Sequence, residues 1–230
     1  MAKIILIETS TSLCSTALAV DGEISDYRES TEPRAQAAMT APFIKEMLDR
    51  TGLSVQECDA VCVSSGPGSY TGLRVGVSTA KGLCFSAGIP LLSVNTLEIL
   101  AYQAVEEKLL PKNCRYVIPM IDARRMEVYT AVYDAEQLER VSDIEAKIVD
   151  KDSFSGQLEE GPVLFIGDGA EKCREVLPPE NAYFIQTCPN AKAMRLPAER
   201  ALEQKRFENT AYFEPFYLKQ FVATVSKKLF

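Results

Sequence analysis

The sequence predicts an α/β protein of two lobes, the second of which is smaller and less regular. An isoleucine-rich run at residues 3–8 and a second strand signal ending at Val20 lead into Asp21-Gly22, a dipeptide typical of hairpin turns. Strand and helix patterns then alternate as far as residue 109, and a strand–polar turn–strand unit recurs at residues 115–134. This recurrence predicts two related units, covering residues 1–110 and 111–230.

In the first lobe, the strands expected at residues 3–8, 13–20 and 23–30 form an antiparallel meander. A helical pattern from Pro33 to about Arg50 stops at Thr51-Gly52, and a buried strand follows at residues 59–64. After a glycine-rich turn, a second helix is expected to end at Ala87. A strand at residues 91–94 and a helix at residues 96–109 complete the lobe.

The second lobe is predicted to open with strands at residues 115–121 and 126–134. A short buried strand at residues 163–166 precedes a helix starting at Ala170, and another strand is expected at residues 183–186. A last helix is expected from Pro197 to about Phe207, and the tail from residue 214 shows no strong period.

Composition excludes several classes of function. The 230-residue chain has no histidine, so it can build neither a Ser-His-Asp nor a Cys-His nucleophile, nor a histidine-based zinc site. Its 25 basic and 32 acidic side chains give a net charge of −7, which argues against autonomous nucleic-acid binding. Seven scattered cysteines without CxxC spacing indicate free thiols and no metal site. No apolar stretch reaches membrane-spanning length, so we expect a soluble, cytoplasmic protein without membrane contact.

Two polar turns are candidates for phosphate binding. The first joins the opening strands, and the hydroxyls of Thr9, Ser10 and Ser12 could hold a phosphate or a nucleotide there. An ordinary hairpin turn is favoured, because no glycine in it lets the backbone close on a ligand.

The second turn lies in the stretch Ser64–Arg74, which reads SSGPGSYTGLR. A buried strand runs into a Gly-Pro-Gly turn and then into a helix, which presents free N–H groups and a positive helix end to an anion. Gly68 and Ser69 are therefore further candidate phosphate contacts, and a tight turn capped by Ser69 explains the pattern equally well. The stretch is neither a Walker A loop nor a GxGxxG motif.

Both helices of the first lobe are more apolar than one buried face requires. The first carries two apolar rows about 100–120° apart, and the second carries small residues at four-residue spacing with only two charges, Arg74 and Lys81. Coverage of both sides by the lobe itself is one explanation. A protein–protein interface is the sharper one, with these predicted residues: Met39, Phe43, Met47, Leu73, Gly76, Val77, Ala80 and Cys84.

The second lobe offers fewer candidates. Asp122, Arg124 and Glu127 could form a site, but a hairpin turn with exposed charges is favoured. Asp168 lies between two glycines and could face a ligand from a second turn.

Five stretches together resemble one family. They are Ile7–Thr11 (IETST), Cys14–Leu18 (CSTAL), Gly66–Arg74 (GPGSYTGLR), Ile121–Arg124 with Glu127–Tyr129 (IDAR, EVY) and Pro215–Lys219 (PFYLK). They resemble the TsaB (YeaZ) family over nearly the whole chain, closely in the first half and loosely across residues 135–210.

This resemblance implies the two-lobed actin-like ATPase (ASKHA) fold, with each lobe related to ribonuclease H. It also implies a non-catalytic scaffolding and activating subunit of the complex that makes N6-threonylcarbamoyladenosine on tRNA. Such a subunit pairs with the catalytic paralogue TsaD through its first-lobe helices, is joined by the ATPase TsaE, and meets tRNA only through the complex. No cofactor is expected on the chain alone, and binding of ATP or ADP and of a metal is possible only in the assembled complex. In isolation we expect a homodimer.

The chain departs from the family at two positions. The catalytic paralogue binds a metal through two histidines on its first-lobe helix, and many TsaB members keep one histidine where this chain has Gln36. Glu8 stands where the superfamily more often has Asp. The family has also been called an inactive peptidase homologue, and without histidine this chain has no chemistry for a peptidase. The alternative function is a small-molecule kinase or ATPase that binds ATP between the lobes, with Asp122 and Asp168 as its carboxylates.

Overall fold

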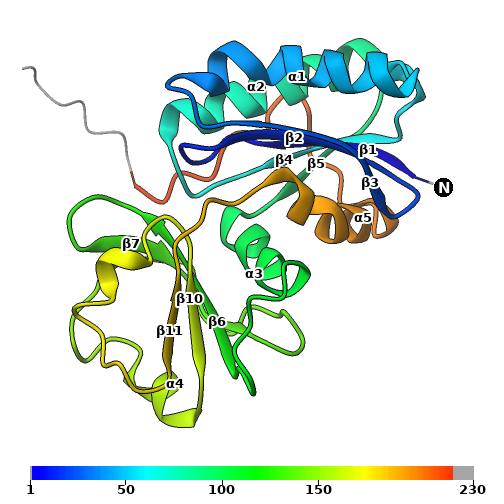
Figure 1. The fold of residues 1–230 in the computed structure, drawn as a ribbon. Helices are drawn as coiled ribbons and strands as arrows, with labels where there is room; N and C mark the ends of the chain where they lie inside the picture. Colours follow the sequence, from blue (N-terminus) through cyan, green and yellow to red (C-terminus); the bar gives the residue numbers. More distant parts are fainter. Residues whose placement is uncertain (1, 220–230) are drawn as a thin grey trace, which may run out of the picture.

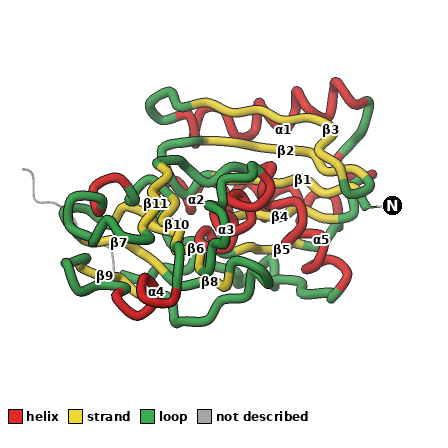
Figure 2. Tube along the Cα trace, turned by 60° about the horizontal axis from the view of Figure 1, so that its bottom comes forward, coloured by secondary structure: helices red, strands yellow, loops and turns green. Residues whose placement is uncertain are grey.

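The computed structural model describes residues 2–219 and arranges them in two lobes, each built on one β-sheet (Figure 1). In the first lobe, β1 (Lys3–Glu8), β2 (Cys14–Val20) and β3 (Glu23–Ser30) form the predicted antiparallel meander. The strands β4 (Ala60–Ser64) and β5 (Leu91–Val94) add to it in parallel, in the order β3-β2-β1-β4-β5 that Figure 2 shows. The central strands are buried on both faces and therefore read as continuous apolar runs.

Helices cover both faces of the first sheet. The helices α1 (Ala35–Thr51) and α2 (Tyr70–Ala87) lie side by side on one face, and α5 (Arg195–Glu203) lies on the other (Figure 1). A short 3₁₀ helix, η1 (Val55–Glu57), precedes β4. Glycines in the left-handed conformation end both long helices, Gly52 after α1 and Gly88 after α2, as their sequences predict.

The second lobe is a six-stranded mixed sheet. Its main path runs β11 (Ala182–Ile185), β10 (Val163–Ile166), β6 (Tyr116–Asp122), β7 (Glu127–Thr130) and β9 (Glu145–Ile148). A two-residue strand, β8 (Tyr133–Asp134), pairs with β6 beside this path. The helix α4 (Ser155–Glu160) and the 3₁₀ helix η2 (Glu171–Cys173) complete the lobe.

A helix from each predicted half of the chain packs against the sheet of the other half, so the predicted boundaries are wrong. The helix α3 (Thr96–Glu106) packs its leucines against the second sheet, in one buried cluster with Val117 and Leu164. The chain then returns to the first lobe: the 3₁₀ helix η3 (Ala191–Met194) and α5 share a buried cluster with Ile4 and Leu6. Residues 191–203 therefore belong to the first lobe, because their apolar sides are buried against β1 and not against the second sheet.

Two further predictions about elements are wrong. The helix expected from Ala170 is only the single turn η2, because Pro178-Pro179 follow too soon for a longer helix. The strand expected at residues 126–134 is divided into β7 and β8, and Val132 between them donates its N–H to the hydroxyl of Ser142 (2.8 Å).

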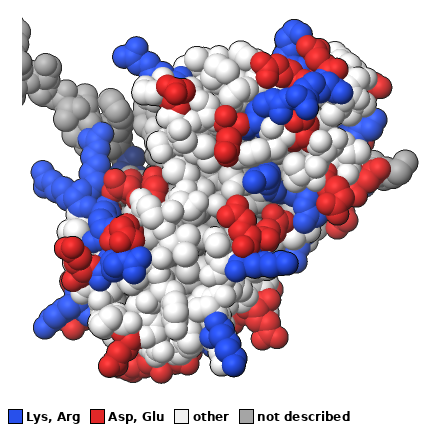
Figure 3. All heavy atoms as spheres, in the orientation of Figure 1, with Lys and Arg blue, Asp and Glu red and all other residues white. Residues whose placement is uncertain are grey.

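Charge and hydropathy agree with the composition. On the face shown in Figure 3, basic and acidic side chains are interspersed, without a continuous basic region on that face. Within residues 2–219, no helix has both the length and the apolar character needed to cross a membrane.

Candidate functional sites: an inter-lobe cleft and an exposed helix pair

The turn between β1 and β2 is bound to the start of α2 by two hydrogen bonds. Thr9 donates its hydroxyl to the carbonyl oxygen of Gly72 (2.8 Å), and Ser69 donates its backbone N–H to the carbonyl oxygen of Ser10 (2.6 Å). The Ser69 hydroxyl also caps α2 by accepting the N–H of Gly72 (3.3 Å). The two polar turns singled out in the sequence are thus one structure.

The glycines of this region allow the turn to approach α2 closely. A Cβ atom on Gly68, Gly72 or Gly76 would lie closer than 3.0 Å to atoms of Ser10 or Thr9, two of them carbonyl oxygens. Gly72 and Gly76, four residues apart on α2, therefore allow close contact with the β1–β2 turn.

The same contacts test whether the turn can hold the phosphates of a nucleotide. The donors that a phosphate would need, the Thr9 hydroxyl and the Ser69 N–H, are used inside the protein. Ser12 faces Cys188, with 3.5 Å between its Oγ and the cysteine Sγ. The hydroxyls of Ser10 and Thr11 are buried and have no hydrogen-bond partner among the described residues. Two donors that a phosphate cradle of the kind the actin-like ATPase fold implies would need, the Thr9 hydroxyl and the Ser69 N–H, are thus already occupied.

Gln36 closes the turn from α1. Its Nε2 donates to the carbonyl oxygens of Thr11 (2.7 Å) and Ser12 (3.3 Å). The Gln36 side chain thus holds the β1–β2 turn in place.

Glu8 is an unusual buried acid at the end of β1. It accepts the N–H of Ser10 at Oε1 (2.5 Å), and its Oε2 has no hydrogen-bond partner among the described residues. The pKa of Glu8 is raised to about 7, chiefly by burial and in small part by the charge of Asp168, whereas the hydrogen bond from Ser10 acts in the opposite direction. Glu8 therefore carries a proton through much of the range below neutral pH.

A cleft of about 630 Å³ separates the lobes and brings together many of the residues predicted from sequence. From the first lobe it is lined by Ser10, Ser12, Gly68 and Ser69, and from the second by Asp122, Arg124 and Asp168. Thr9 lies beneath this surface and does not line the cleft.

The acidic residues in and beside the cleft have partners within the protein. Asp168 accepts the N–H of Asp122 at 2.9 Å, and Asp122 forms an ion pair with Lys172. Burial raises the pKa of Asp168. Glu127 pairs with Lys219. Within residues 2–219, no group of three or more acidic or cysteine side chains is placed to hold a metal ion.

The predicted interface residues are, with one exception, part of the protein's own core. Only Met39 is partly exposed; the seven others are buried, namely Phe43, Met47, Leu73, Gly76, Val77, Ala80 and Cys84. Most of the seven belong to the cluster between the helix pair and the first sheet. Their selection as exposed interface residues was wrong, because the broad apolar surface of each helix covers both the sheet and the neighbouring helix.

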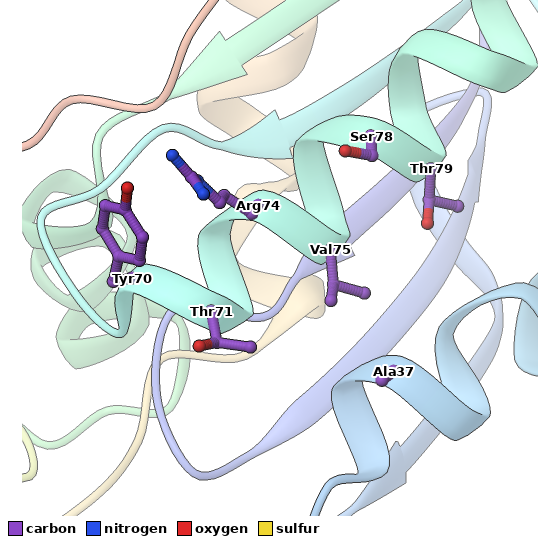
Figure 4. A pocket seen from close by; sticks show the side chains of 7 residues that line it. All are labelled: Ala37, Tyr70, Thr71, Arg74, Val75, Ser78 and Thr79. Carbon is purple, nitrogen blue, oxygen red and sulfur yellow. The ribbon is translucent and has the colours of Figure 1, made fainter.

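A different set of residues is exposed on the helix pair. Facing outward from α1 and α2 are small or apolar side chains, here called the α1/α2 face: Ala37, Ala38, Ala41, Thr71, Val75, Ser78, Thr79 and Phe85. Between the helices is a groove of about 490 Å³, in which Thr71 and Val75 point from α2 toward the side where Ala37 lies (Figure 4). Phe85 is 87 % exposed, which is rare for a side chain of that size.

Sequence reasoning missed the α1/α2 face because it followed the largest apolar side chains. The available signal was the absence of acidic residues: neither residues 35–45 nor residues 69–87 contain Asp or Glu. A solvent-facing helix surface normally carries charges of both signs.

The C-terminal strap, residues 208–219, runs along the first lobe to the mouth of the cleft. It begins at β5, where Glu208 donates its N–H to Leu91 (2.8 Å), and Lys81 of α2 donates to its carbonyl oxygens at Ala211 and Phe213 (3.1 Å each). Phe216 donates its N–H to Ser65 (2.7 Å). The Pro215–Lys219 motif thus contacts the Gly66 turn, and the rest of the predicted tail lies outside the described residues.

Comparison with known proteins gives consistent relatives. A family model described as TsaD, tRNA N6-adenosine threonylcarbamoyltransferase, matches residues 33–226. The chain is 34% identical over 135 residues to the threonylcarbamoyladenosine biosynthesis protein TsaB of Escherichia coli K12; this match spans 59% of the chain and only 56% of that relative. It is 29% identical over 226 residues to TsaB of Haemophilus influenzae, spanning 94% of the chain and 93% of that protein.

Solved structures agree with these relatives. YeaZ from Pseudomonas aeruginosa superposes with a TM-score of 0.81 at 26% identity, over 95% of this chain and all of that chain. An activator of 2-hydroxyisocaproyl-CoA dehydratase from Clostridium difficile shares only the fold, with a TM-score of 0.50 at 10% identity over 90% of this chain and 98% of that one. The predicted two-lobed actin-like ATPase fold is confirmed.

Proposed function

The chain belongs to the TsaB (YeaZ) family of tRNA threonylcarbamoyladenosine biosynthesis proteins, and on that premise we propose that it is a non-catalytic scaffolding and activating subunit. Its partner in this role is the catalytic paralogue TsaD, and the ATPase TsaE joins the pair. The α1/α2 face is the surface through which the chain docks on TsaD.

The exposed helix pair is the observation that supports this proposal most strongly. An outward surface of small and apolar side chains without a carboxylate costs little to desolvate and lets another helix approach closely. The inner sides of the same helices form the core of the lobe, so the surface is held rigid before a partner arrives.

The contacts around the β1–β2 turn support the non-catalytic assignment. Because the Thr9 hydroxyl and the Ser69 N–H are used internally, the chain is not expected to bind a nucleotide by itself, and we propose that ATP or ADP and any metal enter only in the assembled complex. The alternative, an independent small-molecule kinase or ATPase, would need those donors. With a net charge of −7, contact with tRNA would come through the complex, in the cytoplasm.

Titration calorimetry of this chain with its catalytic paralogue tests the proposal. Ser78 is exposed in the groove, so Ser78→Arg should prevent docking without unfolding the chain. The matched control is Ile148→Arg, which places the same charge at an exposed apolar position of β9 in the other lobe. Loss of binding in Ser78→Arg alone supports the proposed face, and equal binding by both variants contradicts it.

Light scattering of the isolated chain tests the expected homodimer. If two copies pair through the α1/α2 face, Ser78→Arg should be monomeric at concentrations where the wild type is dimeric. A dimer that persists in Ser78→Arg would place self-association on another surface.

A further inference from the structure

One charged side chain borders the groove of the α1/α2 face, and the fold holds it in place. Arg74 projects from the first turns of α2, where its guanidinium lies over the Tyr70 ring at 4.1 Å from the ring centroid (Figure 4). Its Nε donates to the hydroxyl of Tyr217 at 3.2 Å. The Tyr70 and Tyr217 rings are themselves in contact, with centroids 4.7 Å apart.

Arg74 has no acidic partner within the described chain. None of the ion pairs formed by residues 2–219 includes it, although Glu214 is near enough for its charge to act on the guanidinium. The only other charge on α2, Lys81, is used by the carbonyl oxygens of the C-terminal strap. Arg74 is thus a positioned cation beside a groove without a carboxylate.

We infer that Arg74 is the anchor that receives a carboxylate from the docking partner, and that the Pro215–Lys219 motif serves to hold Arg74 for this contact. The inference rests on the proposed docking function of the α1/α2 face. With Nε bonded to Tyr217, the two terminal nitrogens of the guanidinium are placed to form a bidentate pair with an Asp or Glu. The partner surface is therefore a helix with small side chains and one acidic residue.

A second copy of this chain does not offer that chemistry. Residues 35–45 and 69–87 contain no acidic residue, and the two carboxylates further along α1, Glu46 and Asp49, are paired with Arg28 and Lys45. Pairing of two identical faces therefore offers Arg74 no unpaired carboxylate from these helices. A different protein that carries an acid at the matching position neutralises it, which distinguishes the partner from a self-pair by charge.

Titration calorimetry of the full chain with its catalytic paralogue, at about 0.05 and 0.3 M NaCl, tests this contact. Arg74→Gln should weaken binding by about 10-fold or more and reduce its dependence on salt. Arg74→Lys should recover only part of the affinity, because lysine keeps the positive charge but cannot form the bidentate pair with a carboxylate. Tyr217→Phe should give a smaller loss of about 3-fold, because the ring remains and only the bond that orients Arg74 is removed. The control is Lys45→Gln, which removes an exposed α1 charge paired with Asp49.

The partner's carboxylate is identified by changing each Asp and Glu on the paralogue's first-lobe helices to its amide. One of these changes should be non-additive with Arg74→Gln in a double-mutant cycle. If the folded Arg74→Gln chain binds as tightly as wild type, or if no acidic residue couples to it, the inference is overturned while the docking function stands. If the wild type itself does not bind, both fail.

Discussion

Thr9 and Gly72 are joined in both directions: the Thr9 hydroxyl donates to the Gly72 carbonyl oxygen at 2.8 Å, and the Thr9 carbonyl oxygen fills the place where a Gly72 side chain would be. This pair fixes the β1–β2 turn on the first turn of α2. It also uses the hydroxyl that sequence reasoning offered to a phosphate.

Gly72→Ala should therefore destabilise the protein by about 2–4 kcal/mol, because the new methyl group meets backbone that cannot move aside. Gly82→Ala, in the same helix, is the matched control: nothing lies within 4 Å of its added Cβ, so the variant should gain up to about 1 kcal/mol. Urea unfolding measures both. Equal stabilities would contradict the close approach.

The raised pKa of Glu8 predicts a dependence of stability on pH. In the folded protein the pKa is about 7, above the ordinary value of 4.5, so the native state holds this proton more tightly than the unfolded chain. The stability that the neutral form contributes is complete below pH 4.5 and is lost as the pH rises through 7, a change of about 3 kcal/mol.

Glu8→Gln keeps the neutral form at every pH. Its free energy of unfolding should change less between pH 5 and 8 than that of the wild type, and above pH 7 the variant should be the more stable protein. Denaturant titrations across this range measure the difference. Parallel profiles for the two proteins would show that the pKa of Glu8 does not differ between the folded and the unfolded state.

Two neighbouring valines of α2 should respond oppositely to the same change. Val77 is 4 % exposed, so Val77→Arg buries an unpaired charge and should cost more than about 4 kcal/mol, enough to prevent folding. Val75 is partly exposed at the groove, so Val75→Arg should fold normally and lose only partner binding. Circular dichroism with the docking titration separates the cases; a stably folded Val77→Arg would contradict the assigned inner face.

Thiol labelling should divide the seven cysteines into two groups. Cys114 and Cys188 are half-buried, and the other five are buried; burial also raises the pKa of Cys62 well above its usual range. Alkylation of the native protein, read by mass spectrometry, should modify only the two half-buried thiols, and the rest only after unfolding. Rapid labelling of Cys62 in the native protein would contradict the packing of β4.

Local patterns predicted most of the first lobe. Asp21-Gly22 marks the first hairpin, and Gly52 and Gly88 mark the ends of α1 and α2, because each of these signals depends only on neighbouring residues. The return of α5 to the first sheet has no such signal, since it depends on contacts between Ala198 and strands nearly two hundred residues earlier.

The candidate site was predicted in part. The residues selected on α1 and α2 lie on the inner sides of these helices, because Phe43 or Val77 looks the same in the sequence whether it faces a sheet or a partner. The sequence offered Ser10, Gly68 and Asp168 as candidates on three separate turns, and the structure brings them together at one cleft. That the Ser69 N–H is used internally follows only from a three-dimensional contact, its hydrogen bond to the Ser10 carbonyl oxygen.

The most direct measurement is the yield of N6-threonylcarbamoyladenosine on tRNA in a reaction reconstituted from this chain, its catalytic paralogue and the ATPase. Mass spectrometry of the digested tRNA should find the modified nucleoside with the wild type and with Ile148→Arg, and little or none with Ser78→Arg or without the chain. A full yield with folded Ser78→Arg would contradict docking through the α1/α2 face, and a full yield without the chain would contradict its role as an activating subunit.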